Sequence, residues 1–306
     1  MFIEQGVKSE NKFAKYIVGS IMIILASFLG QIPFIVALEF DADKNGTTYP
    51  KDEAGIMRYF DSNVTLILLL ISFVFVMIGV ILVVRFLHKQ TMHSITTSRN
   101  KVDWGRIFFS FSVWSALTVG TTLISYYNNP ADFIINFKPI PFAILVVIGV
   151  ILIPIQTSAE EYIFRGYLMQ GFANLVKNKW FPLVMTSLIF GGLHFFNPEV
   201  IKMGPIIMIY YIGTGLFLGI ITLMDEGLEL ALGFHAANNL IGALLITSDW
   251  SAFQTHSILK DISEPSAGAD IIVPVLIIYP ILLLIFSKKY QWTNWKEKLT
   301  GKISKF

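Results

Sequence analysis

Long apolar stretches alternate with short polar segments along the whole chain. Eight of these stretches approach or exceed the ~20 residues that a helix needs to cross a bilayer. Only helices and closed barrels can span lipid, and the stretches lack the period-2 alternation of β-strands. They therefore predict eight transmembrane helices, at about 16–38, 64–87, 106–127, 141–165, 180–197, 204–224, 229–248 and 270–287.

Small residues and proline add predictions about packing within these spans. Gly215 and Gly219 form a G-x-x-x-G motif in the sixth span, which favours close contact with a neighbouring helix. Pro154 lies in the fourth span just before its polar residues, where it is expected to bend the helix.

Composition supports the same class. The 306 residues are 54% hydrophobic and 14% charged, with a mean hydropathy of +0.65, whereas soluble domains carry about 25% charged residues. We therefore expect an all-α polytopic membrane protein with a single membrane domain, 1–306, that contacts the lipid bilayer and no nucleic acid. The chain has no cysteine, which excludes disulfides, thiol nucleophiles and cysteine metal sites.

The basic residues predict the orientation of the spans. If the N-terminus is cytoplasmic, most of the 23 lysine and arginine residues, including Lys8 and Lys305, fall in inner segments. Positive charge is retained on the cytoplasmic side of membrane proteins. Both termini are therefore predicted to be cytoplasmic, and the acidic loop 41–62 is predicted to lie outside.

Three ionisable residues interrupt the fourth predicted span, in the segment SAEEYIFRG. Glu161 and Arg165 are four residues apart and share a helix face, so Arg165 is predicted to neutralise Glu161. Glu160 is rotated by about 100° and lacks a local cation. A carboxylate in such a setting suits general-base catalysis, although a salt bridge at a helix end would explain the same residues.

Two later spans carry histidines. The sequence FGGLH places Phe190 and His194 one helical turn apart, and HAANN places His235 and Asn239 on one face, with Asn238 pointing elsewhere. A packed histidine and an interhelical hydrogen bond are the simpler explanations of these two clusters. The remaining histidines fall in predicted loops and are assigned no role: His88, His93 and His256.

The spacing of the clusters predicts one shared polar site. Glu160 and His194 lie equally far from residue 177, in the middle of the connection between their helices. In an antiparallel pair they would have similar depth, provided that the fourth helix continues to about residue 174. The segment 166–179 contains no proline and is compatible with that continuation.

These motifs resemble a known family. E-E-x-x-x-R at 160–165, F-x-x-x-H at 190–194 and H-x-x-x-N at 235–239 are similar, in order and helix placement, to the CAAX protease and bacteriocin-processing (CPBP, or ABI) family of intramembrane proteases. The family includes the endoprotease that trims prenylated CAAX proteins. The resemblance covers about residues 140–250, and it implies that the protein has an eight-helix core with a membrane-embedded catalytic cavity.

The resemblance also implies roles for the motif residues. Glu160, assisted by His194, would activate a water molecule that hydrolyses a peptide bond. His235 and Asn239 would form the oxyanion hole, and Glu161 and Arg165 would shape the site. The chemistry is consistent, since a carboxylate and an imidazole can deprotonate water and aligned donors stabilise an oxyanion.

The resemblance leaves the cofactor open between two alternatives. Catalysis without a bound cofactor is favoured, because the H-E-x-x-H signature of zinc proteases is absent. Zinc is the alternative, with Glu160, His194 and His235 as a His₂Glu ligand set that leaves one coordination position open.

The leading hypothesis is an intramembrane endopeptidase that acts on membrane-associated, apolar or lipidated peptides or proteins. A non-catalytic bacteriocin-immunity or scaffold protein with the same fold is the alternative. A proton-coupled transporter is disfavoured because no inverted repeat is found. The simple basic tail and the lack of a eukaryotic targeting signal favour a multi-pass protein of the bacterial inner (cytoplasmic) membrane.

Overall fold

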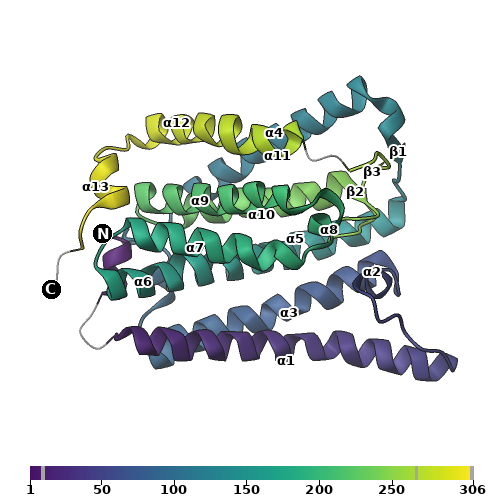
Figure 1. Cartoon of the computed structure of the whole chain (residues 1–306), viewed down its shortest axis with the longest axis horizontal. Helices are drawn as coiled ribbons and strands as arrows, with labels where there is room; N and C mark the ends of the chain where they lie inside the picture. The colour runs from purple at the N-terminus through teal and green to yellow at the C-terminus, as the bar shows by residue number, and fades with distance from the viewer. Residues whose placement is uncertain (8–10, 266–267, 304–306) are drawn as a thin grey trace.

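Helices form most of the computed structural model, which describes residues 1–7, 11–265 and 268–303 (Figure 1). The predicted all-α membrane class is confirmed. The α-helices are α1 (Phe13–Asn45), α2 (Glu53–Met57), α3 (Ser62–Leu82), α4 (Trp104–Asn128), α5 (Pro139–Glu161), α6 (Met169–Val176), α7 (Trp180–Leu193), α8 (Pro198–Met203), α9 (Met208–Asp225), α10 (Glu229–Leu245), α11 (Ala269–Val273), α12 (Tyr279–Tyr290) and α13 (Trp295–Thr300).

Shorter elements connect or extend these helices. Three of them are π-helical: η2 (Val83–Leu87), η5 (Tyr162–Leu168) and η8 (Pro274–Ile278). The 3₁₀ segments are η1 (Ile3–Gly6), η3 (Met92–Ile95), η4 (Pro130–Asp132), η6 (His194–Phe196) and η7 (Pro205–Ile207). In a small sheet, β3 (Leu259–Asp261) pairs antiparallel with β1 (Phe133–Ile135) and parallel with β2 (Ile246–Ser248).

Six helices in the described part of the chain are long and apolar enough to cross a membrane. They are Phe13–Asn45, Ser62–Leu87, Trp104–Asn128, Pro139–Val176, Pro205–Asp225 and Asp270–Tyr290. The other two predicted spans correspond to shorter helices, the apolar Trp180–Phe196 and the 17-residue α10. The prediction of eight full-length spans is therefore not confirmed. Other parts of the protein cover most of α10. Because this helix contacts little lipid, its length need not match the thickness of the bilayer.

The core is built around α10. This helix packs against α4, α5 and α9, while α1 pairs with α3 and α7 pairs with α9. Buried aromatic residues fill the space between α4, α9, α10 and α12, and the Trp114 and Phe234 rings lie 4.3 Å apart between their centroids. Burying such rings supplies much of the packing energy of a core.

The G-x-x-x-G motif confirms the predicted close contact. A Cβ atom at Gly215 would lie 3.0 Å from the backbone of Ser187 on α7, and one at Gly219 would lie 2.5 Å from Leu183. The missing side chains therefore allow α9 to approach α7 closely.

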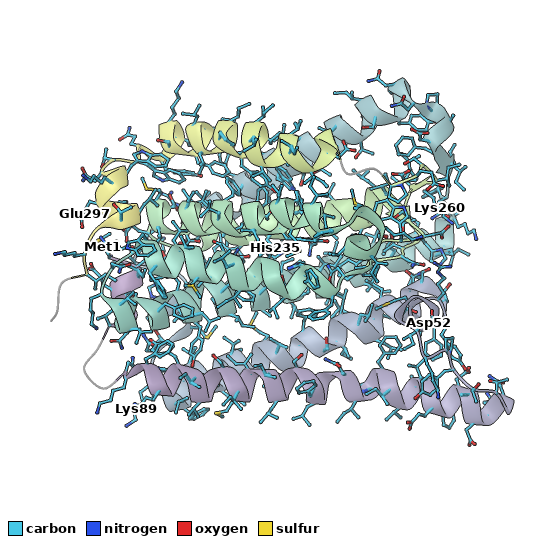
Figure 2. All side chains as sticks on the ribbon, in the orientation of Figure 1. Met1, Asp52, Lys89, His235, Lys260 and Glu297 are labelled. Carbon is cyan, nitrogen blue, oxygen red and sulfur yellow. The ribbon has the colours of Figure 1, made fainter. Side chains whose placement is uncertain are left out.

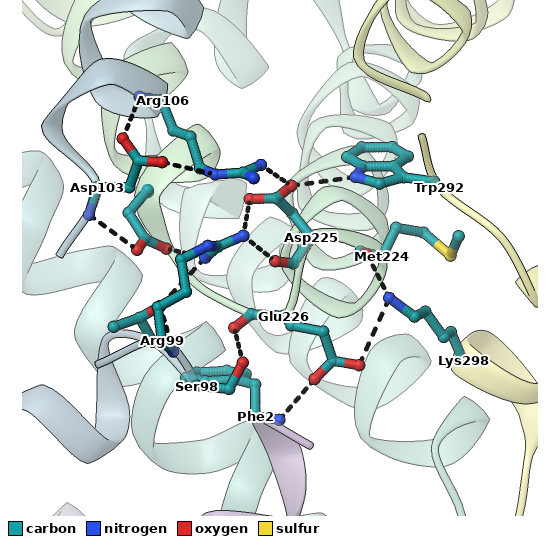
Figure 3. A network of polar contacts seen from close by, with 12 residues as sticks. Phe2, Ser98, Arg99, Asp103, Arg106, Met224, Asp225, Glu226, Trp292 and Lys298 are labelled. Carbon is teal, nitrogen blue, oxygen red and sulfur yellow. Dashed lines mark hydrogen bonds and ion pairs between the residues drawn. The ribbon is translucent and has the colours of Figure 1, made fainter. Parts of the chain in front are cut away.

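Charged residues join the loop before α4 to the turn between α9 and α10 (Figure 3). Arg99 donates to Asp225 at 2.9 Å and to Glu229 at 3.0 Å. Arg106 also pairs with Asp225, whose Oδ1 accepts a 3.0 Å hydrogen bond from the indole of Trp292. Arg99 and Arg106 therefore neutralise the buried carboxylates of Asp225 and Glu229. The orientation argument, which counted basic residues on each side of the membrane, did not predict these ion pairs.

The two ends of the chain are held at this same end of the bundle (Figure 1). The backbone N–H of Phe2 donates to Glu226 at 2.7 Å, and the buried Lys179 pairs with Glu297 at 3.2 Å. Figure 2 shows Met1, Lys89 and Glu297 at one end, Asp52 and Lys260 at the other and His235 between them. This arrangement is compatible with the predicted orientation, although Lys8 and Lys305 lie outside the described residues.

The orientation can be tested with single thiols, because the chain has no cysteine. We expect a membrane-impermeant maleimide added to intact cells to label a Lys51→Cys variant and not a Lys101→Cys variant. Both positions are exposed, and both should label after the membrane is permeabilised. The reverse pattern in intact cells would show that the termini lie outside.

The contact between α10 and α4 gives a stability prediction. A Cβ atom at Gly233 would lie 2.1 Å from the carbonyl oxygen of Ile107, whereas one at Gly242 on the same helix meets nothing within 4 Å. Gly233→Ala should therefore destabilise the protein by about 1–3 kcal/mol. Gly242→Ala should be neutral or stabilising by up to about 1 kcal/mol. Thermal unfolding in detergent measures both, and equal effects would contradict the close contact.

Candidate active site

A cavity of about 970 Å³ lies inside the bundle and collects most of the predicted site residues. Glu160, His194, His235 and Asn239 line it, although they come from three separate predicted spans. Glu161 and Arg165 lie behind the cavity wall and are fully buried. The structure thus brings the three motifs together, while the catalytic roles of their residues stay predictions.

One continuous helix positions the glutamates. α5, the π-helical η5 and α6 run without interruption from Pro139 to Val176, and Lys177 then turns the chain with a positive φ of 56°. The expected continuation to about residue 174 is therefore confirmed. The π-helical turn begins directly after Glu161, and such turns are frequent at functional sites.

The predicted pair of Glu161 and Arg165 is confirmed. Arg165 Nη1 donates to Glu161 Oε1 at 2.9 Å, and both side chains are inaccessible to solvent. Arg165 Nη2 donates to the carbonyl of Gly215 at 3.1 Å, and its guanidinium lies 4.4 Å from the centre of the Phe190 ring. These contacts compensate for the loss of water around a buried cation.

His235 lies between the two glutamates. Its Nδ1 is 2.7 Å from Glu161 Oε1, and its Nε2 is 3.6 Å from Glu160 Oε2. Glu160 Oε2 is thus within ion-pair distance of His235, while the joint action of Glu160 with His194 stays a prediction. The spacing of residues along a helix predicts which face of that helix a side chain lies on. It does not predict which residue of another helix that side chain contacts.

The two carboxylate oxygens of Glu160 differ in their hydrogen bonds. Its Oε1 accepts a hydrogen bond from Gln156, one helical turn earlier. Its Oε2 is buried and has no hydrogen-bond partner among the residues that the structure describes. An unpaired carboxylate oxygen in a cavity is a natural position for binding water or a substrate N–H group.

His194 is held by its own helix and by an aromatic ring. Its Nδ1 is 2.7 Å from the carbonyl oxygen of Phe190, and its ring stacks on Tyr211 with 4.5 Å between centroids. A carbonyl oxygen can only accept, so Nδ1 carries the proton and Nε2 is the acceptor in the neutral ring. The Phe190–His194 spacing therefore fixes the tautomer of the histidine.

Two amides of the site, Gln156 and Asn238, were not among the predicted site residues. Gln156 donates to Glu160 and accepts from Asn239 Nδ2 at 3.0 Å. Asn238, which was predicted to point elsewhere, also lines the cavity and donates to Asn239 Oδ1 at 3.0 Å. Four-residue spacing from Glu160 could have identified Gln156. Asn238 could not be found in this way, because the contact joins adjacent residues.

The other histidines are not all in exposed loops. His88 is buried and contacts Asn11 at 3.2 Å and Tyr167 at 3.1 Å. Burial lowers the pKa of His88 to about 4, so it is neutral at pH 7. His93 is exposed, and His256 pairs with Asp61 at 2.9 Å.

Glu160, His194 and His235 are the ligand set that the zinc alternative requires. Within residues 1–7, 11–265 and 268–303 there is no group of three His, Asp or Glu side chains arranged to hold a metal ion. His235 directs both ring nitrogens towards glutamates, and His194 donates Nδ1–H to a backbone carbonyl, which leaves its Nε2 as an acceptor. Zinc therefore stays the alternative to catalysis without a cofactor.

Comparisons with known proteins agree with the geometry. The family model described as type II CAAX prenyl endopeptidase Rce1-like matches residues 138–241. YyaK of Bacillus subtilis (strain 168), an uncharacterized protein, is 31% identical over 287 residues, which is 92% of this chain and 95% of that protein. The chain belongs to the CPBP family. No solved structure matches it.

The segment matched to the CPBP model contains every predicted site residue, from Glu160 to Asn239. It also contains Gln156 and Asn238, which complete the hydrogen bonds of the cavity. The matched segment therefore contributes the motif residues of the cavity, while α1 and α3 contribute further lining from outside it.

The buried ion pair predicts an asymmetric response to mutation. Arg165→Met leaves the Glu161 carboxylate buried without its cation, which should destabilise the protein by ~3–5 kcal/mol. The double variant Glu161→Leu/Arg165→Met removes both charges and should lose less stability than the single variant. Unfolding in detergent compares the two, and a larger loss in the double variant would contradict this account.

Proposed function

We propose that the chain is an intramembrane endopeptidase in which Glu160 and His194 activate a water molecule. The supporting observation is that Glu160, His194, His235 and Asn239 line one cavity within the segment matched by the CAAX endopeptidase model. Peptide-bond hydrolysis needs a base for the attacking water and donors for the oxyanion, and these four side chains can supply both.

The attacking water would lie between Glu160 Oε2 and His194 Nε2. The first atom has no hydrogen-bond partner, and the second is the acceptor nitrogen of its ring. Glu160 takes one proton as the water oxygen attacks the carbonyl carbon, while His194 orients the second hydrogen. The protonated Glu160 then returns its proton to the leaving amine as the C–N bond breaks.

The oxyanion would be bound from α10. Asn239 Nδ2 uses one of its two N–H groups on Gln156 and keeps the other for a substrate oxygen. His235 donates Nδ1–H to Glu161, so Nε2 can donate as well only when the ring carries both protons. The flanking Glu160 and Glu161 compensate for that positive charge.

The lining indicates the substrate class. Beside the polar residues, the cavity is lined by Ile23 and Ile24 of α1 and by Phe73 and Val76 of α3. An apolar or lipidated segment would bury against this wall, since burial of apolar surface favours binding. We therefore propose membrane-associated peptides or proteins as substrates, in the cytoplasmic membrane of a bacterium such as the source of the YyaK relative.

Removal of either activating group should abolish cleavage. The substrates are first identified by comparing membrane proteomes of cells that express wild-type or Glu160→Gln protein. On a peptide from such a substrate, Glu160→Gln and His194→Ala should each lower kcat by at least about 10²-fold, because a positioned acid–base group contributes 10²–10⁴-fold. The control variants Glu39→Gln and His93→Ala change exposed residues and should retain full activity.

Wild-type rates in folded Glu160→Gln and His194→Ala proteins would refute the mechanism. Stoichiometric zinc in the purified protein, with loss of activity on chelation, would refute the proposal that water is activated without a metal. A cellular phenotype that survives both substitutions would indicate a role that does not need proteolysis.

A further inference from the structure

A chain of side-chain hydrogen bonds crosses the bundle and ends on Glu160. It begins at Trp114 on α4, whose Nε1 donates to Asn238 Oδ1 at 3.1 Å. Asn238 Nδ2 donates to Asn239 Oδ1 at 3.0 Å, and Asn239 Nδ2 donates to Gln156 Oε1 at 3.0 Å. Gln156 Nε2 then donates to Glu160 Oε1. The chain therefore links α4, α10 and α5.

The two end groups of this hydrogen-bond chain fix the direction in which its hydrogen bonds are donated. An indole N–H can only donate, and an ionised carboxylate can only accept. Each amide between them must therefore turn its oxygen towards Trp114 and its nitrogen towards Glu160. Tyr210 supports the same orientation, since its hydroxyl donates to Asn238 Oδ1 at 3.4 Å. If any one of these amides were flipped, two donors or two acceptors would face each other.

We propose that Trp114, Asn238 and Gln156 are positioning residues that orient the Asn239 amide and the Glu160 carboxylate through this chain. The inference rests on the proposed function of these two groups. The chain keeps an N–H of Asn239 available for the oxyanion, where a flipped amide would present an oxygen. It also occupies Oε1 of Glu160 and leaves Oε2 for the attacking water.

Other charged or titratable groups also surround Glu160. His235 approaches from α10, His194 lines the same cavity at the end of α7, and Glu161 and Arg165 follow on its own helix. Tyr210 and Tyr211 line the cavity from α9, and α3, which packs against α5, carries no titratable residue. The test must therefore separate the amide chain from these neighbours, and a double-mutant cycle does so.

The cycle combines Trp114→Phe with Gln156→Met. These residues do not hydrogen-bond to each other, so their effects should add unless the chain connects them. Trp114→Phe retains an aromatic ring against Phe234 but removes the only obligatory donor at the start of the chain. We expect it to lower kcat by about tenfold, with KM within about twofold. The acidic limb of the kcat profile should move to higher pH, because a carboxylate loses support for its charged form.

In the Gln156→Met background the link to Glu160 is already cut, so Trp114→Phe should cause no further shift of the acidic limb. It should still lower kcat, because Trp114 orients Asn239 through Asn238. Trp292→Phe is the matched control. Trp292 is as buried as Trp114, at 8% and 7% exposure, and its indole donates to Asp225 outside the chain. Its substitution should leave the acidic limb unchanged. If Trp114→Phe does not fold, Asn238→Leu breaks the same link and replaces it in the cycle.

Additive shifts of the acidic limb in Trp114→Phe and Gln156→Met, or an equal shift from Trp292→Phe, would overturn the proposal. A second readout does not need turnover. The carboxylate stretching band of Glu160, identified by infrared difference from Glu160→Gln, should move in Trp114→Phe and stay fixed when Gln156→Met is also present. If the wild-type protein cleaves no peptide, the proposed function fails, and this band still decides whether the chain reaches Glu160. An unchanged band in Trp114→Phe overturns the inference.

Discussion

The fully buried contact of Arg165 with Glu161 is the interaction on which the rest of the site depends. Burying a guanidinium costs several kcal/mol unless its hydrogen bonds and charge are compensated. Arg165 obtains that compensation from its own helix, from the Gly215 carbonyl on α9 and from the Phe190 ring on α7. Glu161 also accepts a hydrogen bond from His235, which connects the ion pair to α10. One ion pair thus ties together the helices that carry the catalytic candidates.

The same contact explains why glycines and histidines occur together in this half of the chain. Gly215 offers its carbonyl to Arg165 and, because it lacks a side chain, also lets α9 approach Ser187 on α7. Phe190 packs under the guanidinium and accepts the Nδ1–H of His194 with its carbonyl. Phe190 therefore both stabilises the buried guanidinium of Arg165 and orients the His194 ring. The same residue contributes to stability and to the proposed chemistry.

Much of this organisation could be predicted from the sequence. The apolar stretches matched helices within a few residues for α3, α4 and α9, and the four-residue spacing predicted the Glu161–Arg165 pair. Two predicted spans correspond to Trp180–Phe196 and α10, which end within three residues of the predicted bounds but are shorter than the six helices long enough to cross a membrane. The contact of His235 with Glu160 was not predicted, since the rotation of α10 against α5 cannot be read from either helix alone.

The sequence by itself determined the all-α membrane class, the three motifs and the faces on which their residues lie, because hydropathy and helical period act locally. The tertiary structure alone decided which side chains meet across the bundle. It placed His235 between two carboxylates and brought Gln156 and Asn238 to the wall of the cavity. It also linked Trp114 to Glu160 through side-chain hydrogen bonds. The physical reason is that hydrogen bonds require distances near 3 Å and aligned donors, and only packed helices supply these between residues far apart in the chain.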